Sequence, residues 1–196
     1  VDISVEMHLA GMRHARPGMR ESEVAAKVAE VALAHNGVPS FPIIATINGQ
    51  TLHNHYHGNT IKSGDLFLLD AGAETEMRYA GDLSSTFPVD PGFTPLQKEI
   101  YQLCLDAHMA TVSMLKPGTS FKEVHLTACR TIFEGLKAFG LTRGDTEEAV
   151  RQIINSPQPA PEIVEPAPEP SSPDDLEAWL LSSPEATRRN AAFCDI

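Results

Sequence analysis

Residues 66–87, LFLLDAGAETEMRYAGDLSSTF, contain two runs with strand character that are joined by a tight connection at Thr75 to Arg78. This pattern predicts an antiparallel hairpin. Asp70 and Asp82 stand at the inner ends of the two runs. A carboxylate in such a place is costly unless it meets a cation or several hydrogen-bond donors. The hairpin therefore raises the question of what its two aspartates bind.

The spacing of Asp70 and Asp82 bears on that question. They are twelve positions apart, so a hairpin that turns near Glu76 places them side by side on one face of the sheet. Two adjacent carboxylates form an acid/base pair or hold a metal ion between them. The same residues also fit turn-forming chemistry. Spacing alone leaves the metal site and the turn open.

Helical patterns surround the hairpin. Two helices are expected in the first 37 residues, separated by Arg16-Pro17-Gly18. Their apolar stripes are Val5, Leu9 and Met12 in the first, and Val24, Val28, Val31 and Leu33 in the second. The pattern of residues 41–61 predicts a strand followed by a turn. Further helices are expected over residues 95–115 and 121–139, with a short one from about Asp145.

An internal repeat links the two halves of this pattern. ARPGMRESEV at residues 15–24 and LKPGTSFKEV at residues 115–124 share a basic residue, Pro-Gly and Glu-Val at the same spacing. The match indicates two copies of one helix–turn–helix unit, with a chance match as the alternative.

Three histidines precede the hairpin in the segment TLHNHYHGNT. His53, His55 and His57 alternate with other residues, so in an extended segment all three would face the same way. Such a cluster fits either a metal site or a substrate-facing rim. The five other histidines lie in helical patterns and are interpreted as structural or surface residues.

The composition excludes some classes of partner. The net charge of −11 argues against nucleic-acid binding. The absence of a long apolar run or signal-peptide pattern argues against a membrane span and secretion, and a cytoplasmic location is expected. From residue 152 to residue 196 the chain is acidic and holds eight of its 15 prolines. This composition predicts a largely disordered tail with short helices.

The string GQTLHNHYHGNTIKSGDLFLLDAGAETEMRYAGDLSSTFPV, with the two Pro-Gly segments, closely resembles the aminopeptidase P and prolidase group of metallopeptidases. The resemblance covers Val1 to Arg151. It implies an α+β fold, the first part of a pita-bread domain over residues 1–151, with helices packed on an antiparallel-rich sheet. The duplicated fold of that group also accounts for the repeat.

The resemblance implies roles for individual residues. Asp70 and Asp82 match metal ligands, with Asp82 bridging two divalent ions (Mn, Co or Zn). His53 matches a catalytic histidine that faces the substrate, and the neighbouring His55 could take that role. Ser84 matches a hydroxyl near the metals. In such enzymes a metal-bridging hydroxide attacks the peptide bond before a proline, so the implied substrates are proline-containing peptides.

Two departures from the family pattern bear on activity. The connection between the aspartates is one residue longer than in most relatives, which predicts a bulge at Thr75 to Arg78. The remaining family ligands, a histidine and two glutamates, have no match, since Glu162, Glu165 and Glu169 stand in the wrong context. The chain therefore looks truncated, and we expect weak or absent metal binding and little activity.

Two further interpretations stay open. One is a non-enzymatic relative that pairs with a full-length subunit or with itself through an open sheet edge. The other is a shifted reading frame that produced the tail.

Overall fold

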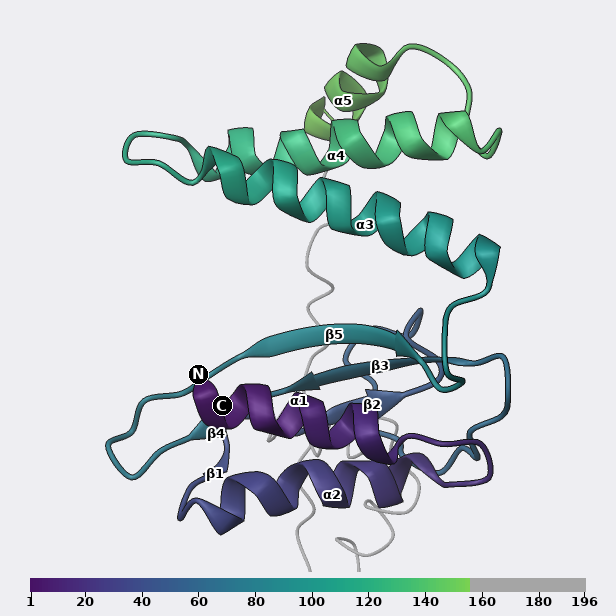
Figure 1. Ribbon diagram of the computed structural model, residues 1–196. Coiled ribbons are helices and arrows are strands. Elements are labelled where there is room, and N and C mark those ends of the chain that lie inside the picture. Colours follow the sequence, from purple (N-terminus) through teal and green to yellow (C-terminus); the bar gives the residue numbers. More distant parts are fainter. Residues whose placement is uncertain (156–196) are drawn as a thin grey trace, which may run out of the picture. The chain divides into compact units, whose positions relative to one another are not determined.

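The structure is a computed structural model that describes residues 1–155. These residues fall into two compact units, one of residues 1–92 and one that begins at Phe93. The first unit combines helices with antiparallel strands, and the second is helical (Figure 1). The predicted tail lies outside the described residues, apart from the end of one helix that crosses the expected boundary at Arg151 and continues to Asn155.

The first unit begins with two helices, α1 (Asp2–His14) and α2 (Glu21–Ala34). The turn between them contains Gly18 at φ 94°, a backbone conformation that glycine adopts without strain. The side chain of Glu23 accepts a hydrogen bond from the backbone N–H of Arg20 and so caps the start of α2. Both helices and the break between them confirm the prediction.

The buried face of α1 differs from the predicted apolar stripe. Val5, Leu9 and Met12 are all exposed, whereas the buried residues are Ser4, Met7, His8, Ala10 and Gly11. Ser4 and His8 can be buried because both side chains have hydrogen-bond partners on the strands. At Gly11 a Cβ atom would overlap the Leu69 side chain, so a small residue lets the helix lie close to the sheet. In α2, Val24 and Val28 are buried as expected, while Leu33 is exposed.

Two small antiparallel sheets complete the first unit. The order in the larger sheet is β2 (Ile44–Thr46), β3 (Leu66–Ala71) and β5 (Leu83–Pro88), with β3 in the centre. The smaller sheet pairs β1 (Val38–Pro39) with β4 (Ala73–Glu74). The predicted hairpin is therefore confirmed, since β3 and β5 pair antiparallel. Leu66 is opposite Pro88 at one end of the pairing, and Ala71 is opposite Leu83 at the other.

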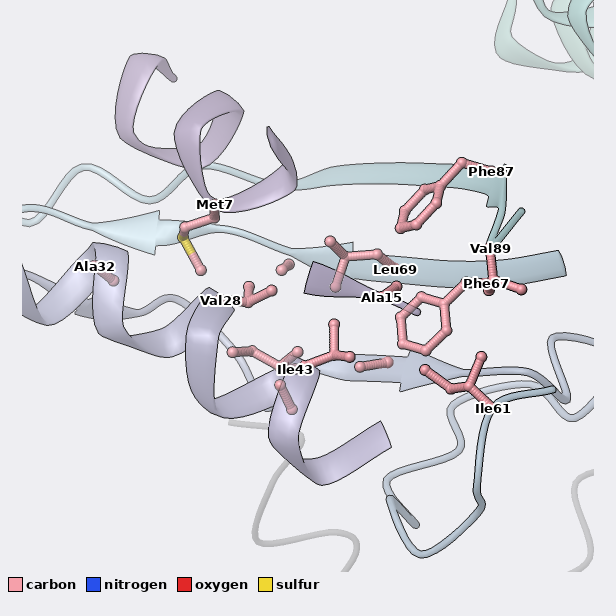
Figure 2. Packing of buried hydrophobic residues seen from close by; sticks show 14 of the residues in the cluster. Met7, Ala15, Val28, Ala32, Ile43, Ile61, Phe67, Leu69, Phe87 and Val89 are labelled. Atoms are coloured by element: carbon pink, nitrogen blue, oxygen red, sulfur yellow. The ribbon is translucent and has the colours of Figure 1, made fainter. Parts of the chain in front are cut away.

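The core of the first unit lies between the helices and one face of the larger sheet. Alternate residues of β3, namely Phe67, Leu69 and Ala71, are fully buried. Figure 2 shows Leu69 and Phe67 among Met7, Val28, Ile43 and Phe87. The other residues of β3 are Leu66, Leu68 and Asp70, which strand alternation turns to the opposite face. We call this the far face of the sheet.

The second unit contains α3 (Pro95–Met114), α4 (Phe121–Ala138) and α5 (Thr146–Asn155). The turn between α3 and α4 repeats the turn between α1 and α2, with Gly118 at φ 89°. Ser120 and Glu123 form a capping box at the start of α4. The helix–turn–helix repeat seen in the sequence is thus present in the structure. Among residues 1–155, no helix is long and apolar enough to cross a membrane.

Candidate functional site

Asp70 lies at the centre of the candidate site, on the middle strand of the larger sheet. It pairs with Ile44 on one side and with Ser84 on the other. Its Oδ1 atom is buried, and within residues 1–155 it has no hydrogen-bond partner. A buried acceptor without a partner costs free energy of folding, on the order of 1–3 kcal/mol and more when it is charged. Such an atom fits a ligand for a cation.

Asp82 lies just before β5 and is exposed. The register places it two positions beyond the Asp70–Ser84 pair, opposite Gly72. Because side chains alternate, this offset keeps Asp82 on the same face as Asp70. The two aspartates therefore share one face, as predicted, but they are diagonal neighbours because the hairpin does not turn at Glu76. Ser84, also exposed, is the residue directly opposite Asp70.

The hairpin loop explains the change of register. The backbone N–H of Arg78 donates to the Thr75 carbonyl at 2.9 Å, and the N–H of Thr75 donates to the Tyr79 carbonyl at 3.1 Å. Arg78 has φ 63°. A three-residue loop that ends in a left-handed residue is the bulged type of hairpin connection. It centres the hairpin on Met77 instead of Glu76.

Two glycines allow the chain to pass close to itself beside the aspartates. A Cβ atom at Gly72 would overlap the carbonyl oxygen of Gly81, and one at Gly81 would overlap the Ser4 hydroxyl. Ser40 ties the same place together, because its hydroxyl donates to the Gly81 carbonyl at 2.6 Å. The glycines of DAG and AGD thus have a packing role, while the aspartates next to them do not close the turn.

Helix α1 supports the hairpin from the core side. The ring of His8 lies 2.6 Å from the Ser85 hydroxyl and 3.1 Å from the Ala71 carbonyl oxygen, measured from Nδ1 and Nε2 respectively. Since a carbonyl only accepts, Nε2 carries the proton in this contact. Ala71 and Ser85 are neighbours of Asp70 and Ser84. The structural role expected for His8 is confirmed.

The three histidines of the preceding segment lie in different environments. His53 is exposed and has φ 51°. Nε2 of His57 lies 2.9 Å from the Ile43 carbonyl oxygen; because a carbonyl only accepts, Nε2 carries the proton and donates it. His55 is half-buried, and within the described part of the chain its buried Nδ1 has no hydrogen-bond partner. The segment is not an extended strand with three equivalent side chains.

A hollow of about 450 Å³ lies along the sheet on the side of Leu66 and Leu68, the far face that also carries Asp70. Its remaining lining comes from the loop after β2, from the turn before β3 and from β5, namely Ile47, Gly49, Gln50, Gly64, Asp65 and Thr86. A volume of this size is typical of a small-ligand site.

A buried glutamate, Glu21, holds the loop that leads to the histidines. It is fully buried at the start of α2 and accepts hydrogen bonds from Thr46, Ile47 and Asn59. The sequence shows Glu21 only as an acidic residue in a first helical turn, which is a common surface pattern. Its burial depends on contacts between distant segments, so no local signal identifies it.

The site residues suit a divalent cation in type but are few in number. Carboxylate oxygens are preferred ligands of hard divalent ions, and the partnerless Oδ1 of Asp70 fits that use. In the part of the chain that the structure describes, no three His, Cys, Asp or Glu residues gather as a metal-binding group. The histidine trio is therefore not a metal site by itself here, and Asp70 and Asp82 supply at most two ligands.

Comparisons with known proteins identify the family of this chain. The model of metallopeptidase family M24 matches residues 1–154. A probable Xaa-Pro aminopeptidase of Chaetomium globosum is 36% identical over 149 residues, which is 74% of this chain and 25% of that protein. The Xaa-Pro aminopeptidase of Escherichia coli is 34% identical over 80% of this chain and 36% of that protein.

A solved structure extends the agreement to the fold. Zinc-substituted E. coli aminopeptidase P in complex with product superimposes with a TM-score of 0.73 at 34% identity, covering 78% of this chain and 35% of that one. The chain thus spans between a quarter and somewhat over a third of the length of these relatives. The resemblance noted in the sequence and the α+β fold that it implied are both confirmed.

Proposed function

Because the chain belongs to metallopeptidase family M24, we propose that it is part of a metal-dependent peptidase that hydrolyses the bond before proline in Xaa-Pro peptides. The observation that carries the proposal is the buried, partnerless Oδ1 of Asp70 beside Asp82 on one face of the sheet. The relatives of this chain include proteins named Xaa-Pro aminopeptidase. These names do not favour the alternative of a non-enzymatic partner.

Asp70 and Asp82 would hold the cation, with Mn²⁺, Co²⁺ and Zn²⁺ as the candidates. A divalent ion bound there supplies Lewis-acid chemistry for amide hydrolysis. Asp70 is held rigidly, because β3 is paired on both sides. Asp82 is exposed and close to the hairpin loop, so it can adjust its position to the ion. Two carboxylates alone bind weakly, and a complete site needs ligands from beyond the described residues.

The substrate-facing histidine is the second part of the proposal. Of the two candidates, His55 is the better supported, because its Nδ1 is buried without a partner while His53 is exposed at a turn. A histidine with a free ring nitrogen can donate to or accept from a peptide group. Ser84, directly opposite Asp70, offers a hydroxyl next to that aspartate. His53 is assigned to the rim of the site.

The test is metal-dependent hydrolysis by the full chain. Xaa-Pro dipeptides and Xaa-Pro-Xaa peptides are incubated with Mn²⁺, Co²⁺ or Zn²⁺, and binding of Mn²⁺ is followed by electron paramagnetic resonance on the same samples. We expect weak Mn²⁺ binding and slow turnover, both lost in Asp82→Ala.

Asp106→Ala serves as the matched control, because Asp106 is an exposed aspartate on α3 outside the site. It should leave both readouts unchanged. Two results would contradict the proposal: the absence of Mn²⁺ binding to the parent chain, or binding or turnover that survives Asp82→Ala.

A further inference from the structure

Glu21 has a hydrogen-bonding environment that suits an ionised carboxylate. Oε1 accepts from the Thr46 hydroxyl at 2.9 Å and from the Ile47 backbone N–H at 2.8 Å. Oε2 accepts from the backbone N–H and the side-chain amide of Asn59, at 3.2 Å and 2.9 Å. All four partners donate, and an ionised carboxylate only accepts. The Glu21 side chain is fully buried, and its partners Ile47 and Asn59 are half-buried.

These four bonds join the two ends of one loop. Thr46 ends β2 and Ile47 begins the loop, whereas Asn59 stands at its other end. The segment Ile47–Asn59 between them holds His53, His55 and His57, together with residues that line the hollow on the far face. The Glu21 side chain therefore closes this loop at its neck.

The backbone at the start of α2 reinforces the closure. The first helical N–H groups have no partner inside a helix. Here the N–H of Glu21 donates to the Asn59 carbonyl and the N–H of Ser22 donates to the His57 carbonyl, each at 3.0 Å. The His57 ring is also bonded to the Ile43 carbonyl. The loop thus meets α2 through His57 and Asn59, the residues that follow His55.

We propose that Glu21 is a positioning residue of the candidate site, whose buried carboxylate closes the loop Ile47–Asn59 and so fixes where His55 lies. The loop closure is a property of the chain itself, while its importance for peptide hydrolysis rests on the proposed function. Glu21 lies outside the set of residues expected to touch metal or substrate. It acts on the site only through the loop.

Substitution of Glu21 by glutamine isolates this effect. The side chain keeps its size, but one acceptor oxygen becomes an NH₂ group that faces donors. At least one end of the loop then loses its acceptor, because an NH₂ group cannot accept from a backbone N–H. Glu23→Gln is the matched control, because it is the same substitution in the same helical turn. The Glu23 side chain bonds only Arg20 in the described structure.

The measurement is NMR of the full chain without metal, so it needs no enzymatic activity. In Glu21→Gln we expect the side-chain signals of His55 and His57 to move to the values of a free imidazole. Amide hydrogen exchange at the loop ends should accelerate at least about tenfold, as expected for loss of hydrogen bonds to a charged group. The signals of His8, which bonds the strands, should stay unchanged, as should the histidine signals in Glu23→Gln.

A second variant covers the case in which Glu21→Gln fails to fold. Asn59→Ala removes one loop-side donor and leaves the bonds to Thr46 and Ile47 in place, so it should release His55 while the strands keep their protection. The proposal would be overturned by folded variants in which His55 does not respond. It would also be overturned by loss of the His8 signals together with those of His55 in both variants, which would make Glu21 a general structural residue. None of these NMR readouts depends on peptidase activity. A failure of this proposal can therefore be distinguished from a failure of the proposed function.

Discussion

The helical hairpin α1–α2 and the hairpin α3–α4 are two versions of one sequence pattern. Each turn contains Pro-Gly with the glycine in a left-handed conformation, at φ 94° for Gly18 and φ 89° for Gly118. In each, a glutamate three residues after the N-cap accepts from the backbone N–H of that cap. These features are local, and they form in both units regardless of what surrounds the helices.

The two hairpins differ at positions where the first one packs on the sheet. Ala15 is fully buried, while Leu115, one hundred residues later, is 64% exposed. Glu21 is fully buried and Phe121 is 84% exposed. In the first unit the strands and the loop Ile47–Asn59 cover these positions. Local sequence thus sets the turn and the caps, whereas the strands determine burial and create the site.

The largest expected difference between the units concerns two phenylalanines. Phe67 on β3 is fully buried, so Phe67→Ala should lower the free energy of unfolding by about 3–5 kcal/mol. Phe121→Ala, at an 84% exposed position, should change it by less than about 0.5 kcal/mol. Urea denaturation of the two variants measures both values. Similar costs at the two sites would contradict the claim that burial differs between the two units.

A smaller and equal effect is expected at the two turns. Gly18→Ala and Gly118→Ala each place a Cβ atom on a residue with strongly positive φ, at a cost of about 1–2 kcal/mol. In both turns nothing lies within 4 Å of the added Cβ atom, so the strain comes from the backbone alone. Hydrogen exchange of the adjoining helices reports the loss separately for each unit. A cost confined to Gly18 would show that the turn depends on the sheet.

The smallest effect concerns the ion pair that links α4 to α5. The hydrogen bond from Arg130 holds the pKa of Glu147 below its ordinary value of 4.5. A lowered pKa in the folded state stabilises the fold at pH above the unfolded value, and this contribution is lost as pH falls through the folded pKa. Exchange at α5 should therefore gain a slight acid dependence below about pH 4.5.

Glu147→Gln is the control for this acid dependence, because it keeps the size of the side chain and removes the titrating group. The dependence should disappear in that variant. If hydrogen exchange at α5 keeps the same acid dependence in Glu147→Gln, the effect comes from another carboxylate.

Much of the fold follows from short-range signals in the sequence. Pro-Gly with a following Glu predicted both helical turns, and the runs around Asp70 and Asp82 predicted the hairpin. The centre of the hairpin was predicted one residue too early, at Glu76 instead of Met77. The reason is that Arg78 adopts a left-handed conformation although it is not a glycine. The apolar stripe of α1 was also missed, since Ser4 and His8 are buried through hydrogen bonds that only the folded strands supply.

The candidate site was predictable to a lesser extent. The two aspartates were identified because carboxylates in strand-like runs are unusual. The choice between His53 and His55 depends on how the loop is closed, and Glu21 closes it through bonds to residues 25 to 38 positions away. Such contacts leave no periodic pattern. The sequence therefore names the candidates, and tertiary structure separates them.

The most direct test of the central claim is the thermal stability of Asp70→Asn with and without Mn²⁺. If Asp70 is kept for binding a cation, removal of its partnerless charge should leave the metal-free chain at least as stable as the parent. The same substitution should abolish the rise in Tm that Mn²⁺ gives the parent chain. A metal-free variant that melts well below the parent, or one that Mn²⁺ still stabilises equally, would contradict the assignment of Asp70 as a metal ligand.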